Sequence, residues 1–380
     1  MGNCAVFSNN HLMKFLVPEN PPPAATLHKP LSRALWWRAL LGLSILALPA
    51  RAQSGSTLGL EQSTNLQTWQ AVPVTPAMLD AQGRIQVHSD TDRGFYRLQV
   101  PTGFSLIPAG SFTMGRTSGD TDVHAPPVDV TVSAFYMGKT EVTKALWDEV
   151  RIWAEANGYT FVQGGEGKAS NHPVQTVKWY DVIKWCNARS EKEGLTPVYY
   201  TNDAQTAVYK TGGLNVTNAQ VKWAANGYRL PTEAEWEKAA RGGLSGYRFP
   251  WGDTISQSQA KYHGNTTSYS YDLGPSGYNS IGSIGGTTPA TSPAGSFAAN
   301  DYGLYDMEGN VSEWCWDWYG ATTYVDGATD PRGAESGSYR VIRGGSWYDY
   351  ASFCRVAYRN FGSPFGSATI IGFRVARSFR

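Results

Sequence analysis

Residues 229–243, RLPTEAEWEKAARGG, predict a short helix whose two ends are both marked in the sequence. Thr232 can cap the first turn, and Glu235, three residues later, can complete a capping box by bonding back to the backbone of Thr232. Trp236 can then face inward, and Gly242 can end the helix. This is the clearest element of regular structure that the sequence contains.

Two further helices are predicted on the N-terminal side of this stretch. The segments 143–157 and 179–193 each place large apolar residues on one face at helical spacing, and Gly194 can end the second. Between residues 249 and 300 the chain is rich in Gly, Ser and Thr, which predicts long ordered loops or a variable insertion.

The composition favours a compact fold with little regular structure. The 380 residues include 41 Gly, 14 Trp and 21 Tyr. Glycines supply tight turns, and the large rings supply buried area with polar tips. No basic stretch interleaves with aromatic residues, so nucleic acid is not an expected partner. The histidines are scattered singly, which argues against a zinc site.

The N-terminal residues 1–52 are typical of an export signal peptide. Positive charge precedes an apolar run at 39–48, which is too short to span a bilayer, and Ala50 and Ala52 supply small residues at a cleavage site. An uncleaved anchor is the alternative. Removal of this segment takes away five basic residues and one acidic residue. It leaves 27 basic and 30 acidic residues, a net charge of −3. We therefore expect a periplasmic, cell-surface or extracellular protein with no membrane span after cleavage.

The rest of the chain divides into two parts. Residues 58–100 alternate apolar and polar positions over short runs, which predicts a small β-rich module. Residues 101–380 form the main domain.

Seven blocks of the main domain together resemble one family. They are IPAGSFTMG (107–115), VSAFYMGKTEVT (132–143), RLPTEAEWEKAARGG (229–243), FPWGD (249–253), NDYGLYDMEGNVSEW (300–314), RVIRGGSW (340–347) and GFRVAR (372–377). In this order they resemble the sulfatase-modifying-factor domain of formylglycine-generating enzymes, over about residues 104–380. The resemblance implies an α+β fold similar to C-type lectins, with small sheets and few helices.

The resemblance also implies a structural calcium ion. The positions that match the family's ligands are the side chains of Asp306 and Glu313 and the carbonyls of Gly309 and Val311. Such a mixture of carboxylate and carbonyl oxygens suits Ca²⁺. The alternative is a tight turn whose carboxylates accept backbone N–H groups. At a second calcium site of the family this chain has Lys261, whose ammonium cannot be a ligand.

A copper site, by contrast, is not expected. In the active enzymes a glycine-glycine-serine-aromatic turn precedes two cysteines, five positions apart, that bind Cu(I) as thiolates. Here GGSW is followed by Cys354 alone, and Asp349 lies about where the first thiolate would be. A carboxylate is a hard ligand and does not replace a thiolate for Cu(I). Alignment back from GFRVAR moves Cys354 off the second position as well, so the thiolate pair is missing in either alignment.

Three interpretations of Cys354 remain open at this stage. It can form a disulfide with Cys315, since export favours oxidation; it can be a buried free thiol; or it can be a reactive thiolate and the one catalytic candidate. Cys186, on the inner face of a predicted helix, is expected in the core.

Five residues line the segment where the resemblance places a bound substrate peptide: Arg343, Ser346, Trp347, Arg355 and Arg359. The alternative is structural, because arginines in a loop-rich interior often tie carbonyl groups together.

These patterns favour an exported, calcium-stabilised binding protein without copper-dependent oxidase activity. Its partner would be a peptide, a glycan or an envelope protein. The alternative is an oxidoreductase that modifies a residue of a partner protein, as formylglycine-generating enzymes do. A third interpretation is a purely structural module. The sequence does not specify the ligand or the oligomeric state.

Overall fold

The computed structural model describes residues 5–6, 60–63, 70–72, 95–98, 100–117, 120, 125–284, 290–320 and 324–379. The chain divides into two compact units, Met1–Val100 with Arg380, and Pro101–Phe379. No helix among the described residues is both long enough and apolar enough to cross a membrane.

The first unit contains one four-stranded antiparallel sheet. Its strands are β1 (Ala5–Val6), β2 (Leu60–Ser63), β3 (Gln70–Val72) and β4 (Phe95–Leu98), in the order β1-β4-β2-β3. Three of them fall in the predicted module of residues 58–100. Apart from β1, the predicted signal peptide of residues 1–52 lies outside the described residues, so its removal stays a prediction.

The three predicted helices of the second unit are confirmed. They are α1 (Lys144–Ala156), α2 (Trp179–Lys192) and α3 (Glu233–Ala240). The capping box of α3 forms as expected, with the Thr232 hydroxyl accepting from the Glu235 N–H and the Glu235 carboxylate accepting from the Thr232 N–H. The helices α1 and α2 pack together through stacked Trp147 and Trp185 rings, whose centroids lie 5.9 Å apart.

Short strands make up the rest of the regular structure. They are β5 (Phe104–Ile107), β6 (Gly110–Met114), β7 (Val128–Val132), β8 (Phe135–Gly138), β9 (His263–Gly264), β10 (Gly277–Tyr278), β11 (Ser312–Trp318), β12 (Ala328–Thr329), β13 (Arg340–Arg343), β14 (Asn360–Gly362), β15 (Ile371–Gly372) and β16 (Ala376–Ser378). They form sheets in the orders β14-β13-β11-β15, β12-β7-β6, β16-β8-β5 and β10-β9. Two 3₁₀ helices, Asn218–Gln220 and Ala351–Cys354, lie in loops.

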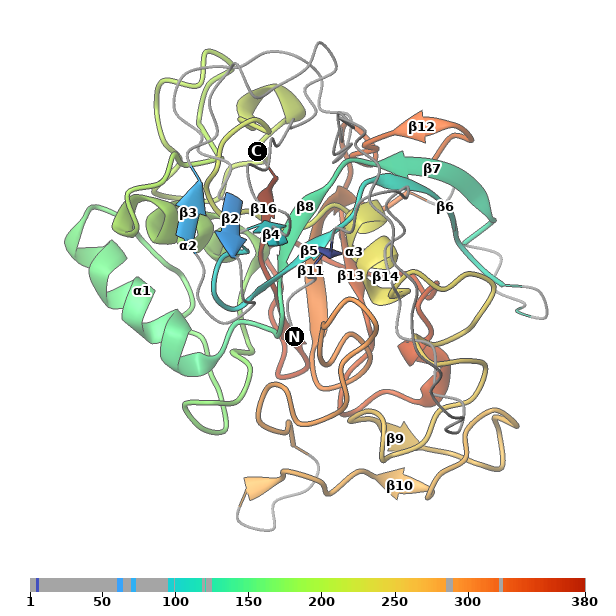
Figure 1. The fold of residues 1–380 in the computed structure, drawn as a ribbon. Coiled ribbons are helices and arrows are strands. Elements are labelled where there is room, and N and C mark those ends of the chain that lie inside the picture. The colour runs from blue at the N-terminus through green and yellow to red at the C-terminus, as the bar shows by residue number, and fades with distance from the viewer. Residues whose placement is uncertain are drawn as a thin grey trace, which may run out of the picture. The chain divides into compact units, whose positions relative to one another are not determined.

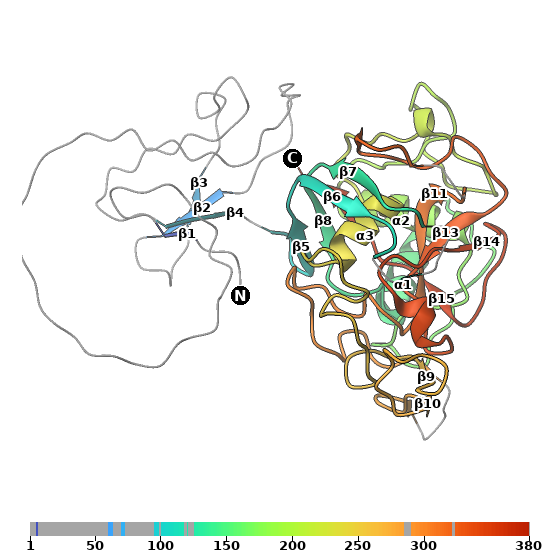
Figure 2. The ribbon, with the colours of Figure 1, turned by 90° about the vertical axis from the view of Figure 1, so that its right-hand side faces the viewer.

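Few helices combined with several small mixed sheets make this unit α+β, as predicted. Helix α3 packs against β6, β7, β11 and β13, while the β9–β10 hairpin lies at the end of the unit opposite β7 (Figures 1 and 2). The C-terminal residues join two sheets, because β15 runs parallel to β11 and β16 pairs with β8.

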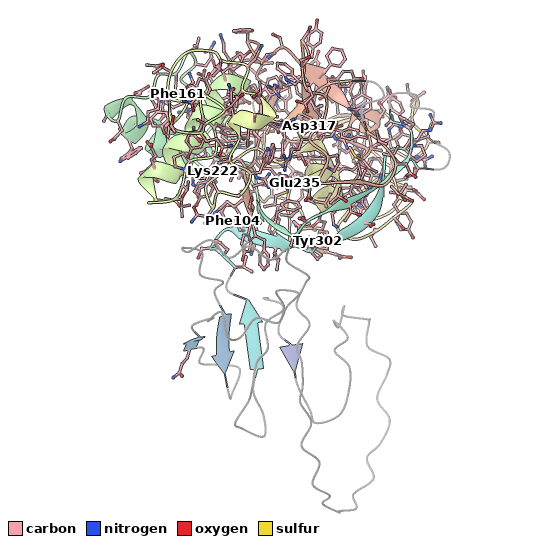
Figure 3. The ribbon with its side chains drawn as sticks, turned by 90° about the horizontal axis from the view of Figure 1, so that it is seen from above. Phe104, Phe161, Lys222, Glu235, Tyr302 and Asp317 are labelled. Atoms are coloured by element: carbon pink, nitrogen blue, oxygen red, sulfur yellow. The ribbon has the colours of Figure 1, made fainter. Side chains whose placement is uncertain are left out.

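The interior holds charged groups as well as rings. Side chains fill the space between the helices and sheets, with Glu235 and Asp317 labelled among them in Figure 3. The guanidinium of Arg340 lies 3.7 Å from the ring centroid of Trp179 and 3.4 Å from that of Trp318. Burial lowers the pKa of Arg340 to about 9. Ring faces thus replace part of the water that this cation loses.

Candidate functional site

Two turns that the sequence singled out meet inside the second unit. The Gly309 N–H donates to the Gly344 carbonyl at 2.8 Å, and the Trp347 N–H donates to the Asn310 carbonyl at 2.9 Å. Asp306 and Asn310 are among the non-glycine residues with positive φ, at 52° and 59°. Strained backbone of this kind persists where its surroundings determine it, and it is concentrated at functional sites.

Cys354 is sealed beneath the GGSW turn. Gly345 has φ +69°, and a Cβ built on it would lie 2.9 Å from the Cys354 Sγ, so the sulfur packs directly against this turn. Burial raises the pKa of the Cys354 thiol well above its usual range, and the nearby Asp349, Glu308 and Asp272 carboxylates raise it further. The neutral thiol is therefore favoured, and neither a nucleophile nor a soft anionic ligand forms readily here.

The disulfide proposed as one role for Cys354 is wrong. Cys186, Cys315 and Cys354 are all free and buried. Cys315 packs in the cluster that contains Trp236, whereas Cys354 packs in a separate small cluster with Phe249. Cys186 is fully buried in the core, as expected from its place in α2. The three thiols thus act as small apolar side chains in different parts of the interior.

Two of the predicted substrate-binding arginines are buried in ion pairs. The Arg343 Nη2 lies 2.5 Å from the Glu237 carboxylate, and Arg359 donates through two nitrogens to Glu233 at 2.7 and 2.8 Å. Arg343 also donates to the carbonyls of Val356 and Tyr358. Burial alone would raise the pKa of Glu233, but Arg359 and Arg343 bring it below its usual value. These contacts favour the structural role that the sequence left open.

The remaining three predicted substrate-binding residues are also engaged within the fold. The Ser346 hydroxyl is buried and donates to Asp349 at 2.6 Å. The Trp347 ring is 9% exposed, and its N–H donates to the Thr369 carbonyl at 3.1 Å. Arg355 lies 3.0 Å from Asp120. The segment is therefore built chiefly from side chains that hold the two turns in place.

Glu313, predicted as a calcium ligand, already has strong partners. Arg374 donates to both of its carboxylate oxygens, at 2.9 and 2.7 Å, and the Trp236 indole N–H donates at 2.7 Å. The Arg374 guanidinium also donates to the carbonyls of Tyr305 and Asp306. A charge-assisted pair this complete leaves Glu313 little capacity for a cation.

Three other carboxylates beside the turn are less well satisfied. One oxygen each of Glu141, Asp306 and Glu308 is buried without a hydrogen-bond partner among the described residues. Asp306 and Glu308 line a small hollow with room for about one water molecule. Burial raises the pKa of all three carboxyls, and Asp306 raises that of Glu141 further. Such groups cost free energy unless a proton or a cation relieves them.

The residues therefore fit a calcium ion in part. Asp306 offers the unpartnered oxygen that the sequence predicted, but Glu141 and Glu308, rather than Glu313, supply the others. Among the described residues no three Asp, Glu, His or Cys side chains converge as a complete metal shell. Carbonyls such as those of Gly309 and Val311 would have to complete it, as is usual for Ca²⁺.

Lys261 places a buried ammonium group against the neighbouring loop of residues 281–283. It is 1% exposed, and its ammonium donates to the Ile281 carbonyl at 2.7 Å and to the Ser283 hydroxyl at 2.8 Å. Burial lowers its pKa to about 8. The amine thus bonds to the kind of oxygen atoms that a hard cation binds.

Sequence reasoning missed Glu141 and Glu308, although both lie in the blocks that carried the resemblance. A third carboxylate within YDMEGNVSEW was the available signal for Glu308. Nothing local could associate Glu141 with Asp306, because they lie far apart along the chain.

The small mixed sheets and few helices of the second unit are the α+β architecture that the family resemblance implies. The chain belongs to the FGE-sulfatase family: residues 96–379 match the sulfatase-modifying factor enzyme 1-like domain.

The known proteins that this chain is similar to differ in their described roles. The chain is 33% identical to the chaperone protein LppX of Paenibacillus barcinonensis, over 72% of this chain and 88% of that protein. It is 32% identical to the formylglycine-generating enzyme of Streptomyces coelicolor, over 71% of this chain and 87% of that protein. Among solved structures, Treponema denticola variable protein 1 superposes with a TM-score of 0.55 at 30% identity, covering 73% of this chain and 95% of that one. CarF superposes with a TM-score of 0.55 at 29% identity, covering 74% of this chain and 99% of the CarF chain.

Proposed function

We propose that this chain is a binding member of the family that does not oxidise cysteine with copper. The observation that carries this proposal is the state of Cys354, the only cysteine after the GGSW turn. It is enclosed by Gly345, and burial keeps its thiol protonated. Because Cu(I) needs at least two accessible soft donors, one sealed thiol is a poor site.

Protein is the favoured class of partner. A relative that shares most of its length with this chain is named a chaperone, which supports binding of protein rather than chemistry on it. We also propose that the chain is exported, from the pattern of residues 1–52, and that its scaffold is similar to C-type lectins, from its small sheets and few helices. A glycan or a component of the cell envelope is a competing partner.

The copper question is tested by two measurements on the purified chain. A competition titration with a Cu(I) chelator under anaerobic conditions should show no tight site. After copper is added, a peptide containing a sulfatase-type cysteine should yield no aldehyde. Aldehyde formation that disappears in Cys354→Ser would establish the alternative, an oxidoreductase of the formylglycine-generating type.

We further propose a structural calcium ion beside the two turns, held by Asp306 together with Glu308 or Glu141 and by backbone carbonyls. The unpartnered buried oxygens of these three residues support it. The ion would neutralise the carboxylates and stabilise the contact between the turns. We expect EGTA to lower the melting temperature by several degrees and added Ca²⁺ to restore it.

The calcium response should depend on particular carboxylates. Asp306→Asn should abolish the response, whereas Asp301→Asn, at an exposed position five residues earlier, should retain it. A melting temperature that millimolar Ca²⁺ does not change would show that protons, and not a metal, satisfy this cluster.

A further inference from the structure

Six aromatic side chains from two distant segments form a continuous group, which we call the aromatic face. Its members are His263, Tyr269, Tyr278, Trp347, Tyr348 and Tyr350. Each ring contacts at least one other. The His263 centroid, for example, lies 4.1 Å from that of Tyr278 and 4.8 Å from that of Tyr350.

The backbone fixes the two segments against each other. The His263 N–H donates to the Asp349 carbonyl at 2.8 Å, and His263 forms a parallel bridge with Tyr350. The aromatic face therefore spans the turn after β13 and the β9–β10 hairpin, which lies in the lower part of Figure 1. Rings held this way lose little conformational entropy when a partner binds.

The aromatic face is accessible and surrounded by small polar residues. Tyr348 is 53% exposed, and His263, Tyr269, Tyr278 and Tyr350 are partly exposed, whereas Trp347 is buried and supports the other rings from below. In the hairpin segment, Leu273 is 63% and Ile281 47% exposed. The rest of residues 262–284 consists largely of Gly, Ser, Thr, Asn and Tyr. Antibody paratopes use the same combination, because tyrosines supply rigid contact area and small polar residues supply adaptable hydrogen bonds.

These two segments present almost no formal charge. In residues 262–284 and 346–353 the acidic and basic side chains are His263, Asp272 and Asp349. The Asp272 carboxylate is buried and accepts from Tyr262 and from the Asn265 N–H, while Asp349 accepts from Ser346. Both carboxylates are therefore engaged inside the fold rather than directed to a ligand.

We propose that the aromatic face binds an uncharged, apolar segment of a partner protein; this rests on the proposed binding function and assigns its site. Exposed aromatic and aliphatic groups without charge are the composition of the centre of protein interfaces. Partner side chains would pack on the rings, and tyrosine hydroxyls would bond to partner backbone. A sugar is less well matched, because the groups suited to fixing its hydroxyls are already bonded within the fold. These are the carboxylates of Asp272 and Asp349 and the amide of Asn279.

The test selects peptides from a random displayed library on the immobilised full chain, with high-salt washes. The selected peptides should be uncharged and rich in Leu, Ile, Phe or Trp. Synthetic copies should bind Tyr348→Ala and Tyr278→Ala about tenfold or more weakly than the wild type. Tyr348→Phe, which keeps the ring, should retain most of the affinity.

Phe361→Ala is the matched control. Phe361 is 46% exposed but packs on Tyr319 and Tyr339, away from the aromatic face, so its loss should leave binding unchanged.

Peptides that bind Tyr348→Ala and Tyr278→Ala as well as the wild type would refute this site while leaving the binding function intact. Selected peptides that are mainly charged, or no selected peptide at all, would also overturn it. So would binding of neutral sugars on a glycan array that Tyr348→Ala abolishes. Copper-dependent aldehyde formation would instead refute the proposed function itself.

Discussion

The interior around β13 and the aromatic face differ from the usual distribution of side chains, because the interior holds charged groups and the aromatic face presents rings to solvent. Beneath the GGSW turn, Arg343 and Arg359 are buried against Glu233 and Glu237. On the accessible side of the same turn, rings such as Tyr348 face solvent. Charge thus maintains the fold here, and the proposed binding site is uncharged ring surface. The arginines suggested by the family resemblance therefore give little guidance to the ligand of this chain.

The largest effect should come from breaking the interior ion pairs. Arg343→Met removes the cation beside one Glu237 oxygen and beside Glu233, and it leaves two buried carbonyls without their donor, although Arg241 still pairs with the other Glu237 oxygen. The free energy of unfolding should fall by about 3–5 kcal/mol. Urea denaturation followed by tryptophan fluorescence measures this. Arg151→Met, in an exposed pair with Glu155, should cost less than about 0.5 kcal/mol. A loss at Arg343 no larger than that at Arg151 would contradict the importance of the buried pairs.

The turn between the two regions should be the next most sensitive point. Gly345 and Gly212 have similar φ values, +69° and +76°, but a Cβ on Gly345 would meet Cys354 and Phe353 within about 3 Å, whereas nothing lies within 4 Å at Gly212. We expect Gly212→Ala to cost about 1 kcal/mol for the backbone conformation alone, and Gly345→Ala about 2–4 kcal/mol. Equal losses in thermal or urea unfolding would mean that Cys354 is not tightly enclosed.

The free energy of unfolding should depend on pH through a buried carboxyl of the interior, Asp317. Burial and the neighbouring Glu233 raise the pKa of Asp317 from 3.8 to about 7. The folded state therefore holds this proton more strongly than the unfolded state. The resulting stabilisation is complete below about pH 4 and is lost as the pH rises through 7. Asp317→Asn should make this decline shallower by on the order of 2 kcal/mol, measured by urea unfolding across this range. An unchanged slope would show that Asp317 titrates normally.

The smallest effect on stability should come from the aromatic face itself. Tyr348→Ala removes a half-exposed ring, so the free energy of unfolding should change by less than about 0.5 kcal/mol. Its effect should appear in peptide binding alone. A large loss of stability would mean that Tyr348 serves the fold rather than a partner.

The sequence predicted local features of this molecule well and long-range contacts poorly. The cap at Thr232 followed from signals within a few residues of each other, and all three helices formed where predicted. The α+β class followed from the family resemblance. Capping groups and apolar periodicity act over one or two turns, so a sequence displays them directly.

The site depended on partners that no local pattern reveals. Glu313 matched a family ligand position, but Arg374, 61 residues away, occupies its carboxylate. Of the three interpretations of Cys354, the disulfide is wrong because Cys315 and Cys354, both on C-terminal segments, are buried in different clusters. The aromatic face likewise combines residues 263–278 with residues 347–350, a juxtaposition that only the folded chain creates.

The pairing of β15 with β11 and of β16 with β8 also bears on how this protein folds. In each pair the two strands lie far apart along the chain, so a long intervening segment has to be closed into a loop before the strands can pair. Folds that depend on such non-local pairings form slowly. Until the distant strand arrives, the edges of β11 and β8 stay open to pairing with other chains.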